Sequence, residues 1–330
     1  MPDITIEENN PTIQSQQKLF AAGESHFNLG EFDAAAACFR RANEIAEANG
    51  EQTAVAESLN WLGEIKYKLG EYGEALLCHQ RSEEIFTSLE NPRGVAQSLL
   101  GIGNVHYYQS SYENALDCFA RSLEILEAHP ESPENSIATA TLKKNIGNVY
   151  VCLGKYDEAL SYYTQSLEIY EAADDHAGYA HALGCAGSVY YYRGEYRQAL
   201  EYFNRSLMLR EEINDWLGIA IATHWIGTIF RKLGDVQQSR ASLTRSLALC
   251  ENTTWKELWY ETICEFGMLC EVEAAQSAGE LKTAKLKEAI AQMEKGVQLL
   301  KEIGSGQAEV HGKELKRIKK NLNVKNQPRI

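Results

Sequence analysis

The segment IGNVYVCLGKYDEALSYYTQSLEIY, Ile146 to Tyr170, contains the features that decide the fold of this chain. Twelve residues after Gly147 comes a small residue, then four further on a bulky one and three further on another small one: Ala159, Tyr163 and Ser166. The turn GKY begins at Gly154, and glycine stops a helix readily because it accepts a left-handed backbone at little cost. The segment therefore predicts two antiparallel helices, A before the turn and B after it, that approach closely at the small residues.

The same pattern recurs along the chain at a nearly constant interval. Its glycines are Gly23, Gly63, Gly103, Gly147, Gly187, Gly227 and Gly267, separated by 40, 40, 44, 40, 40 and 40 residues. The bulky residues that follow the first six are Phe39, His79, Phe119, Tyr163, Phe203 and Leu243. A fixed period of this size is typical of a solenoid of stacked repeats rather than of a globular enzyme core. The sequence therefore favours a protein that works through an extended surface.

A short turn separates helix A from helix B in each of the first six units. The turns are GEF at Gly30, GEY at Gly70, SSY at Ser110, GKY at Gly154, GEY at Gly194 and GDV at Gly234. In five of the six, the second turn residue is acidic or Ser. Such residues suit the start of a helix, because their side chains can accept hydrogen bonds from its first N–H groups.

These features resemble the tetratricopeptide repeat (TPR) family, whose signature is W-x2-L-G-x2-Y…A-x3-F…P. The resemblance covers residues 14–303, with a period of 40 instead of about 34. The closing Pro is absent, and most repeats end in a polar stretch such as ENPRG, DDHAG or NDWLG. Long repeats with "GN" in helix A are similar to kinesin light chains and to Pins/LGN-type adaptors. The resemblance implies an all-α, right-handed superhelical solenoid of about seven helix-turn-helix repeats plus a C-terminal capping helix.

We expect three regions: a disordered tail at residues 1–13, the repeat array at 14–303, and a basic capping helix and tail at 304–330. The last repeat is atypical, with helix B at Lys287–Ile303 and about ten residues added around Ala274–Lys285, which we expect to lengthen helix A and its turn. The basic segment GKELKRIKKNL, Gly312–Leu322, is interpreted as a helix that caps the array. The alternative is a patch that binds an anionic membrane or an acidic partner.

Four extra residues account for the single 44-residue step. They lie near HPESPENS, residues 129–136, where two prolines predict an extended loop between repeats 3 and 4. We interpret this loop as a tolerated surface insertion, and a hinge or docking loop is the alternative.

The charge distribution limits the class of partner. The net charge is −14, and residues 280–330 hold 12 Lys and Arg against 6 Asp and Glu, so the rest of the chain carries −20. Nucleic-acid binding needs clustered basic residues, so we expect no nucleic-acid partner and instead a basic or neutral peptide. No secretory signal or membrane-spanning run is visible. The sequence therefore predicts a cytoplasmic protein.

The cysteines do not form a metal or disulfide pattern. None of the eight belongs to a C-x2-C pair, and Cys38, Cys78 and Cys118 share one position in helix B. That position suits a small core residue. We therefore expect neither a zinc site nor a disulfide framework, as in a reducing cytoplasm.

The TPR resemblance assigns a set of residues to a concave groove lined by the A helices. The seven recurring glycines, Gly23 to Gly267, are called the ladder glycines below. The candidate residues lie one, four and five residues after a ladder glycine, or three before it, and these spacings share one helical face. The candidate peptide-binding residues are Asn60, Glu64, Tyr67, Asn104, Tyr107, Tyr108, Asn148, Tyr191, Tyr192, His224 and Arg231. In the resembling adaptors, the Asn after Gly clamps a peptide backbone, because an amide both donates and accepts hydrogen bonds. Tyrosine supplies flat, amphipathic contact area. The alternative for any single tyrosine is packing between neighbouring A helices.

Catalysis has no support in these motifs. His26 and His106 occupy a packing position of the repeat, and no Cys or Ser stands at a spacing that makes a nucleophile pair. Neither G-x-G-x-x-G nor G-x4-G-K-[ST] occurs, so we expect no enzyme activity and no cofactor.

Three hypotheses for function follow. The first is a non-catalytic adaptor that binds a peptide segment of a partner in its groove. The second is a sensor whose superhelix changes shape when it binds a signalling peptide. The third is a scaffold that self-assembles through the exposed ends of the solenoid.

Overall fold

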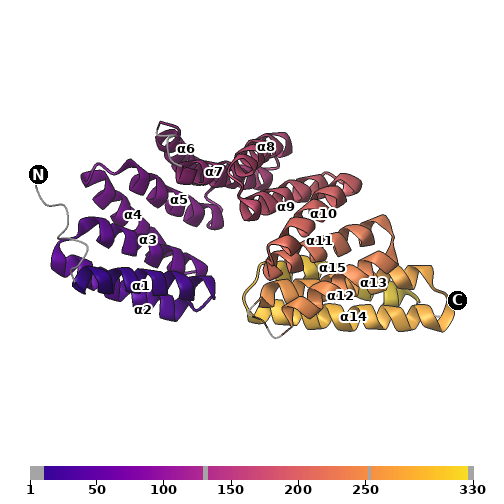
Figure 1. The fold of residues 1–330 in the computed structure, drawn as a ribbon. Coiled ribbons are helices and arrows are strands. Elements are labelled where there is room, and N and C mark those ends of the chain that lie inside the picture. The colour runs from indigo at the N-terminus through magenta and orange to yellow at the C-terminus, as the bar shows by residue number, and fades with distance from the viewer. Residues whose placement is uncertain (1–10, 129–132, 252, 254, 326–330) are drawn as a thin grey trace, which may run out of the picture. The chain divides into compact units, whose positions relative to one another are not determined.

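The computed structural model describes residues 11–128, 133–251, 253 and 255–325, and every regular element in these residues is an α-helix (Figure 1). The helices group into two compact units that divide between Ala173 and Asp174. Unit 1 contains α1 (Pro11–Asn28), α2 (Phe32–Asn49), α3 (Gln52–Lys68), α4 (Tyr72–Ser88), α5 (Pro92–Tyr108), α6 (Tyr112–Glu127), α7 (Pro133–Cys152) and α8 (Tyr156–Ala172). Unit 2 contains α9 (His176–Tyr192), α10 (Tyr196–Glu212), α11 (Trp216–Leu233), α12 (Val236–Cys250), α13 (Lys256–Gln276), α14 (Gly279–Glu302) and α15 (Gln307–Lys325).

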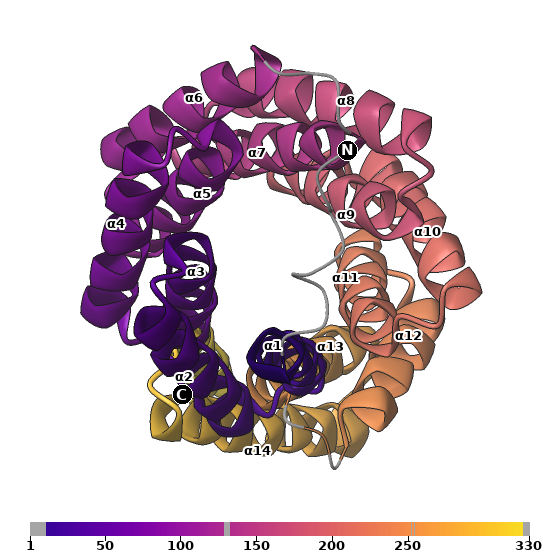
Figure 2. The same cartoon turned by 60° about the vertical axis from the view of Figure 1, so that its left-hand side comes forward.

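Consecutive helices pair as hairpins, and consecutive hairpins stack within each unit. Each odd-numbered helix up to α13 packs most extensively on the even-numbered helix that follows it, as the A and B pattern predicts. Odd-numbered helices of neighbouring repeats also touch one another, as α3 does with α5 and α11 with α13. Figure 2 shows the result within each unit: α3, α5 and α7 lie inside the arc of α4, α6 and α8, and α9, α11 and α13 lie inside that of α10, α12 and α14. The A helices therefore form the inner wall of each unit.

The glycine ladder lets helix A lie directly against a bulky side chain of helix B. A Cβ built on Gly103 would lie 2.4 Å from the Phe119 ring, and one on Gly147 would lie 2.6 Å from the Tyr163 ring. Real Cβ atoms do not approach other atoms so closely, so any larger residue would force the two helices apart. The ladder glycines are therefore fixed by the packing of each hairpin.

A serine in helix B ties each of five hairpins together. Its hydroxyl donates to an alanine carbonyl 26 residues earlier, at O···O distances of 2.7 to 2.9 Å. The pairs are Ser82 with Ala56, Ser122 with Ala96, Ser166 with Ala140, Ser206 with Ala180 and Ser246 with Ala220. The small residue of helix B thus supplies a buried hydrogen bond as well as room for close approach.

The turns follow the sequence pattern, whereas the helix caps lie elsewhere than expected. Gly30, Gly70, Gly154, Gly194 and Gly234 have positive φ, and Ser110 takes the same conformation in the third turn with φ 59°. Among the second turn residues only Asp235 makes a side-chain cap, to the Gln238 N–H. The other caps lie between repeats, where Asn91, Asp175 and Asp215 accept from the N–H of Gly94, Gly178 and Gly218. The motif Asn/Asp-x-x-Gly in the polar stretches is the signal for them.

The atypical last repeat has longer helices than the sequence pattern suggested. Helix A is lengthened as expected, since α13 continues to Gln276. We expected helix B to begin at Lys287, but α14 begins at Gly279. The added residues therefore extend both helices across a short turn. The basic helix is longer too, since α15 spans Gln307–Lys325 and packs on α14 and α13.

Parts of three expected segments lie outside the described residues: 1–10 of the N-terminal tail, 129–132 of the inserted loop, and 326–330 at the C-terminus. Of the inserted loop's two prolines, Pro133 begins α7. In the part of the chain that the structure covers, no helix combines the length and the apolarity needed to cross a membrane. The same residues contain no cluster of three or more His, Cys, Asp or Glu arranged to hold a metal ion.

The ladder glycines lead to a direct test. Gly147→Ala should destabilise the protein by about 2 kcal/mol, because the new methyl group overlaps the Tyr163 ring. Gly73→Ala, in α4, is the matched control: its methyl group meets no atom within 4 Å, so it should stabilise by about 0.5 kcal/mol through helix propensity. Urea unfolding followed by circular dichroism measures both changes. Equal effects of the two substitutions would contradict this account of the ladder.

Candidate functional site

The predicted binding residues lie on the A helices of both units, and each unit is described as its own surface. Unit 1 holds Asn60, Glu64, Tyr67, Asn104, Tyr107, Tyr108 and Asn148 on α3, α5 and α7. Unit 2 holds Tyr191, Tyr192, His224 and Arg231 on α9 and α11. Their surroundings differ, and the differences decide which side chains can contact a ligand.

The three predicted tyrosines of unit 1 form a continuous aromatic cluster. The rings of Tyr67 and Tyr108 meet edge to face with centroids 5.1 Å apart, and Tyr107 meets Tyr108 at 5.3 Å. Tyr67 and Tyr107 are half-buried, and burial raises the pKa of both hydroxyls above the ordinary value, so they stay neutral. Tyr108 is 56% exposed. The first two therefore pack between helices, while Tyr108 presents a ring to solvent.

Glu64 lies beside this cluster and pairs with a neighbouring lysine. Its carboxylate is 3.5 Å from the Lys68 ammonium one turn later on α3. That ammonium also lies 5.1 Å from the centre of the Tyr67 ring. The Tyr67 ring therefore has a positive neighbour, Lys68, whose charge is partly balanced by Glu64.

The same arrangement occurs in unit 2 around a tryptophan. Tyr191 meets Trp225 edge to face at 5.2 Å, and Tyr192 lies 5.7 Å from Tyr191 and 6.3 Å from Trp225. Trp225 stacks on Phe203 of the preceding B helix at an interplanar angle of 10°. Tyr192 is 52% exposed, whereas burial raises the pKa of the half-buried Tyr191 to about 12. Tyr192 therefore presents an exposed ring in unit 2, as Tyr108 does in unit 1.

Asn104 and Asn148, the two predicted asparagines that directly follow a ladder glycine, each have the amide oxygen engaged in a hydrogen bond. Asn104 Oδ1 accepts from Asn145 Nδ2 at 3.0 Å, and Asn148 Oδ1 accepts from the Tyr163 hydroxyl at 2.7 Å. Both side chains are half-buried, and neither Nδ2 group donates a hydrogen bond within the described residues. An amide fixed in this way presents its N–H donors, while one of the two lone pairs of its oxygen is already used. The arrangement is suited to hydrogen-bonding carbonyl oxygens.

Asn60 and His224, which we assigned to the groove, are buried inside the packing. Asn60 is 4% exposed and donates to Ser98 Oγ at 3.0 Å, while His224 is 7% exposed and lies 2.9 Å from Thr262 Oγ1. In both cases the partner lies 38 residues later, on the next A helix of the same unit. These side chains therefore link neighbouring repeats, and the reason is that the position three before the ladder glycine faces the next helix. We leave both out of the proposed contact set.

His79, on α4 of unit 1, is a hydrogen-bond partner of the buried Asn60. It stands where four other repeats place a Phe or Tyr ring against the ladder glycine. Its Nδ1 donates to Asn60 Oδ1 at 3.0 Å. Its Nε2 is buried without a hydrogen-bond partner in the described structure. Burial lowers the pKa of His79 to about 4. The ring is therefore neutral at neutral pH.

Arg231 pairs with a buried carboxylate. Its Nε and Nη2 lie 2.9 and 2.7 Å from Glu265 Oε2, and each side chain is about 10% exposed. Burial alone would raise the pKa of Glu265, but the Arg231 guanidinium, together with His224 and His311, outweighs it, so the net pKa lies below the ordinary value. The groups satisfy each other, so Arg231 is a structural link between α11 and α13.

Sequence reasoning missed the residues that join one repeat to the next. Trp61 and Trp225 stand two before a ladder glycine, and each stacks on the bulky residue of the preceding B helix, Phe39 or Phe203. The signal was their shared register in the repeat, since both positions can be read directly from the ladder.

Three segments of the chain are similar to a known protein family. Residues 18–88, 54–128 and 136–212 match the family model of the tetratricopeptide repeat. No curated protein matches the sequence.

Several solved structures are similar to this chain. The apo form of RapI matches with a TM-score of 0.60 and 18% identity, covering 85% of this chain and 98% of that one. A Rap conjugation gene regulator of a plasmid, solved in complex with a Phr peptide, matches with a TM-score of 0.63 and 16% identity, covering 93% and 82%. The third is a signal-transduction ATPase with a tetratricopeptide repeat sensor from Pyrococcus horikoshii (TM-score 0.65, 16% identity, 92% of this chain and 44% of that one). At these identities the likeness shows a shared fold.

The lowered pKa of His79 predicts a pH-dependent loss of stability. An unfolded chain takes up the proton near pH 6.5, whereas the folded one resists it until about pH 4. This contribution is therefore fully present above pH 6.5 and is lost as the pH falls from 6.5 towards 4. Between pH 7 and 4.5 it amounts to roughly 2–3 kcal/mol.

Comparison of wild type with His79→Phe isolates this contribution. Urea unfolding at both pH values should show that the variant loses roughly 2–3 kcal/mol less on acidification. A pH-independent cost is expected as well, because Asn60 Oδ1 loses its donor. If the two proteins lose stability in parallel, the buried neutral imidazole is not the cause.

Arg231→Met should destabilise by about 3–5 kcal/mol, because it leaves the Glu265 carboxylate buried without a counter-charge. Adding Glu265→Met should recover most of the loss. The control is Arg245→Met, which breaks a 2.6 Å ion pair with Glu211 whose side chains are 46% and 43% exposed, and should cost about 1 kcal/mol or less. Thermal unfolding of the three variants measures this. Equal losses for Arg231→Met and Arg245→Met would contradict the structural role.

Proposed function

The chain belongs to the tetratricopeptide repeat family, and from this premise we propose that it is a non-catalytic adaptor that binds a peptide segment of another protein. The inner wall of unit 1 is the proposed binding surface. One observation carries the proposal: Asn104 and Asn148 stand on adjacent A helices with their Oδ1 atoms occupied and their Nδ2 groups left to donate. Peptide carbonyls are the natural acceptors for two such donors.

The aromatic cluster supplies the other half of the proposed contact. Tyr108 offers an exposed ring on the same helix as Asn104, four residues further on and therefore on the same face. Tyr67 and Tyr107 each contact that ring edge to face. A rigid tyrosine held in this way contributes contact area at a low cost in conformational entropy. In unit 2 we propose the same role for Tyr192, supported by Tyr191 and Trp225.

The chemistry of the surroundings favours a particular class of partner and compartment. Outside residues 280–330 the chain carries −20, which favours a basic or neutral peptide over nucleic acid. None of the eight cysteines is in a disulfide, which supports a reducing compartment such as the cytoplasm.

Peptide sensing is the second candidate. It is favoured by the shared fold with a gene regulator that was solved in complex with a peptide. In that case binding would shift this chain between conformations, and the ligand must interact differently with each of them.

The proposal is tested with a random-peptide phage library. Wild type should enrich peptides that an Asn104→Ala, Asn148→Ala, Tyr108→Ala variant no longer retains, with affinity reduced at least tenfold, since both donors and the exposed ring are removed. The matched control is Arg81→Ala on α4, a 65% exposed outer residue that should leave binding unchanged.

Circular dichroism must show that each variant keeps its helices. Enrichment of the same peptides by wild type and the triple variant would place binding elsewhere. The enriched peptides then separate the two candidates. Small-angle scattering that changes when peptide saturates the protein supports sensing, and an unchanged curve supports a plain adaptor.

A further inference from the structure

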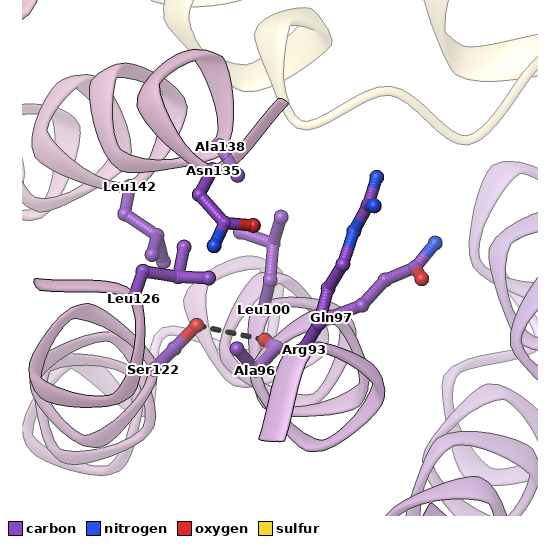
Figure 3. Close-up of a pocket in the computed structure, with 9 residues that line it drawn as sticks. All are labelled: Arg93, Ala96, Gln97, Leu100, Ser122, Leu126, Asn135, Ala138 and Leu142. Atoms are coloured by element: carbon purple, nitrogen blue, oxygen red, sulfur yellow. Dashed lines mark hydrogen bonds between the residues drawn. The ribbon is translucent and has the colours of Figure 1, made fainter. Parts of the chain in front are cut away.

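Unit 1 contains a cavity of about 230 Å³ between α5, α6 and α7 (Figure 3). The proposed function makes no use of it. Its lining residues are Arg93, Ala96, Gln97, Leu100, Ser122, Leu126, Asn135, Ala138 and Leu142.

A difference between two repeat junctions explains why this space is open. At the preceding junction, Phe86 of α4 lies against Gly94 of α5, so closely that a Cβ on Gly94 would be 2.3 Å from the ring. Leu126 and Ala138 hold the corresponding positions here, four residues after the helix B serine and nine before the ladder glycine. The ring is replaced by a shorter aliphatic chain. In addition, α7 has 20 residues where α5 has 17, so its first turn lies beyond the point where α5 begins.

The lining divides into an apolar interior and a polar rim. Leu100, Leu126 and Leu142 form the interior, and the Ser122 hydroxyl is engaged because it donates to the Ala96 carbonyl. In Figure 3, Arg93 and Gln97 rise together from α5 on one side, and Asn135 comes from α7 on the other.

Among the lining residues that the structure describes, Arg93 is the only charged side chain. It is exposed, and no carboxylate in the described part of the chain lies within ion-pair distance of it. It does act on Glu57 of α3 at longer range, where its charge opposes the rise in the pKa of that carboxyl caused by burial. The guanidinium is therefore available to an anionic group at the rim.

The volume limits the occupant. At about 30 Å³ per water, the cavity has the volume of seven or eight waters. For comparison, a dry apolar cavity of about 150 Å³ holds a molecule the size of benzene. Drug-sized ligands need about 300 Å³ or more. The space therefore fits one branched aliphatic or small aromatic group.

We propose that this cavity binds a short branched aliphatic chain attached to a carboxylate, with the chain against Leu100, Leu126 and Leu142 and the carboxylate on Arg93. Two sources share this chemistry: a free short-chain carboxylic acid, and a leucine-like side chain beside an acidic residue in a peptide.

The test uses 4-methylvalerate as the free acid, 4-methylvaleramide as its neutral analogue, and blocked Leu-Glu dipeptide as the peptide source. Saturation-transfer NMR should detect the acid on wild type, with the amide at least threefold weaker because it lacks the charge that Arg93 pairs. Binding of the dipeptide but not the acid would assign the cavity to peptides.

Two variants separate the parts of the proposal. Leu126→Phe with Ala138→Gly copies the filled junction of Phe86 and Gly94 and should abolish binding of every probe. Arg93→Gln should reduce the affinity for the acid to that for the amide without affecting the fold, since the side chain is exposed. Arg41→Gln, on the outer helix α2 and 65% exposed, is the control and should change nothing.

Three outcomes overturn the proposal: no probe binds wild type, the filled variant binds as well as wild type while circular dichroism shows it folded, or acid and amide bind equally. None of these outcomes bears on the proposed peptide-binding surface, because the variants leave Asn104, Asn148 and Tyr108 unchanged. Conversely, loss of peptide selection by the triple variant alone leaves the cavity proposal standing.

Discussion

Each hairpin depends on a glycine of helix A lying in contact with a bulky side chain of helix B. At Gly103 and Gly147 the ring occupies the place that a Cβ would need, so the two helices reach a separation that no other residue allows. This contact sets the register between the helices. Once it is set, the serine of helix B meets a fixed alanine carbonyl, as Ser166 meets Ala140. A single steric constraint therefore determines which residues face inward, which link repeats, and which remain on the surface.

The contacts between neighbouring repeats are made by residues two and three positions before the ladder glycine. Tryptophan two before the glycine stacks on the preceding B helix, as Trp61 does on Phe39. A polar side chain three before the glycine reaches a hydroxyl on the next A helix, as Asn60 reaches Ser98. Because these buried polar groups satisfy one another, they specify how adjacent hairpins align. What remains for a ligand is the residue one after the glycine and the residue five after it, which in repeat 3 are an asparagine and the exposed Tyr108.

The repeat pattern predicted the fold class, the hairpins and the turns, because it arises from steric contacts that recur every 40 residues. It did not predict the direction of side chains whose surroundings depend on the neighbouring repeat. Asn60 and Asn104 are both asparagines on A helices, yet one is buried between helices and the other keeps a free donor group. The distinction comes from Ser98 and Asn145, which lie about one repeat later and whose side-chain positions no local pattern specifies. The bounds of α14 differ for a related reason, since the last repeat departs from the period that identifies the others.

The position four after the helix B small residue shows how a constant scaffold acquires local properties. Phe86 fills its junction with a ring against Gly94. In unit 2 Arg210 fills the equivalent space and pairs with Asp215 at 2.6 Å, so that junction is polar. Leu126 fills its junction only in part, and a cavity results. The position lies outside the contact between glycine and ring, so it varies without altering the hairpin. Variation that the scaffold tolerates in this way is the physical route by which one repeat of an otherwise regular array acquires a binding site.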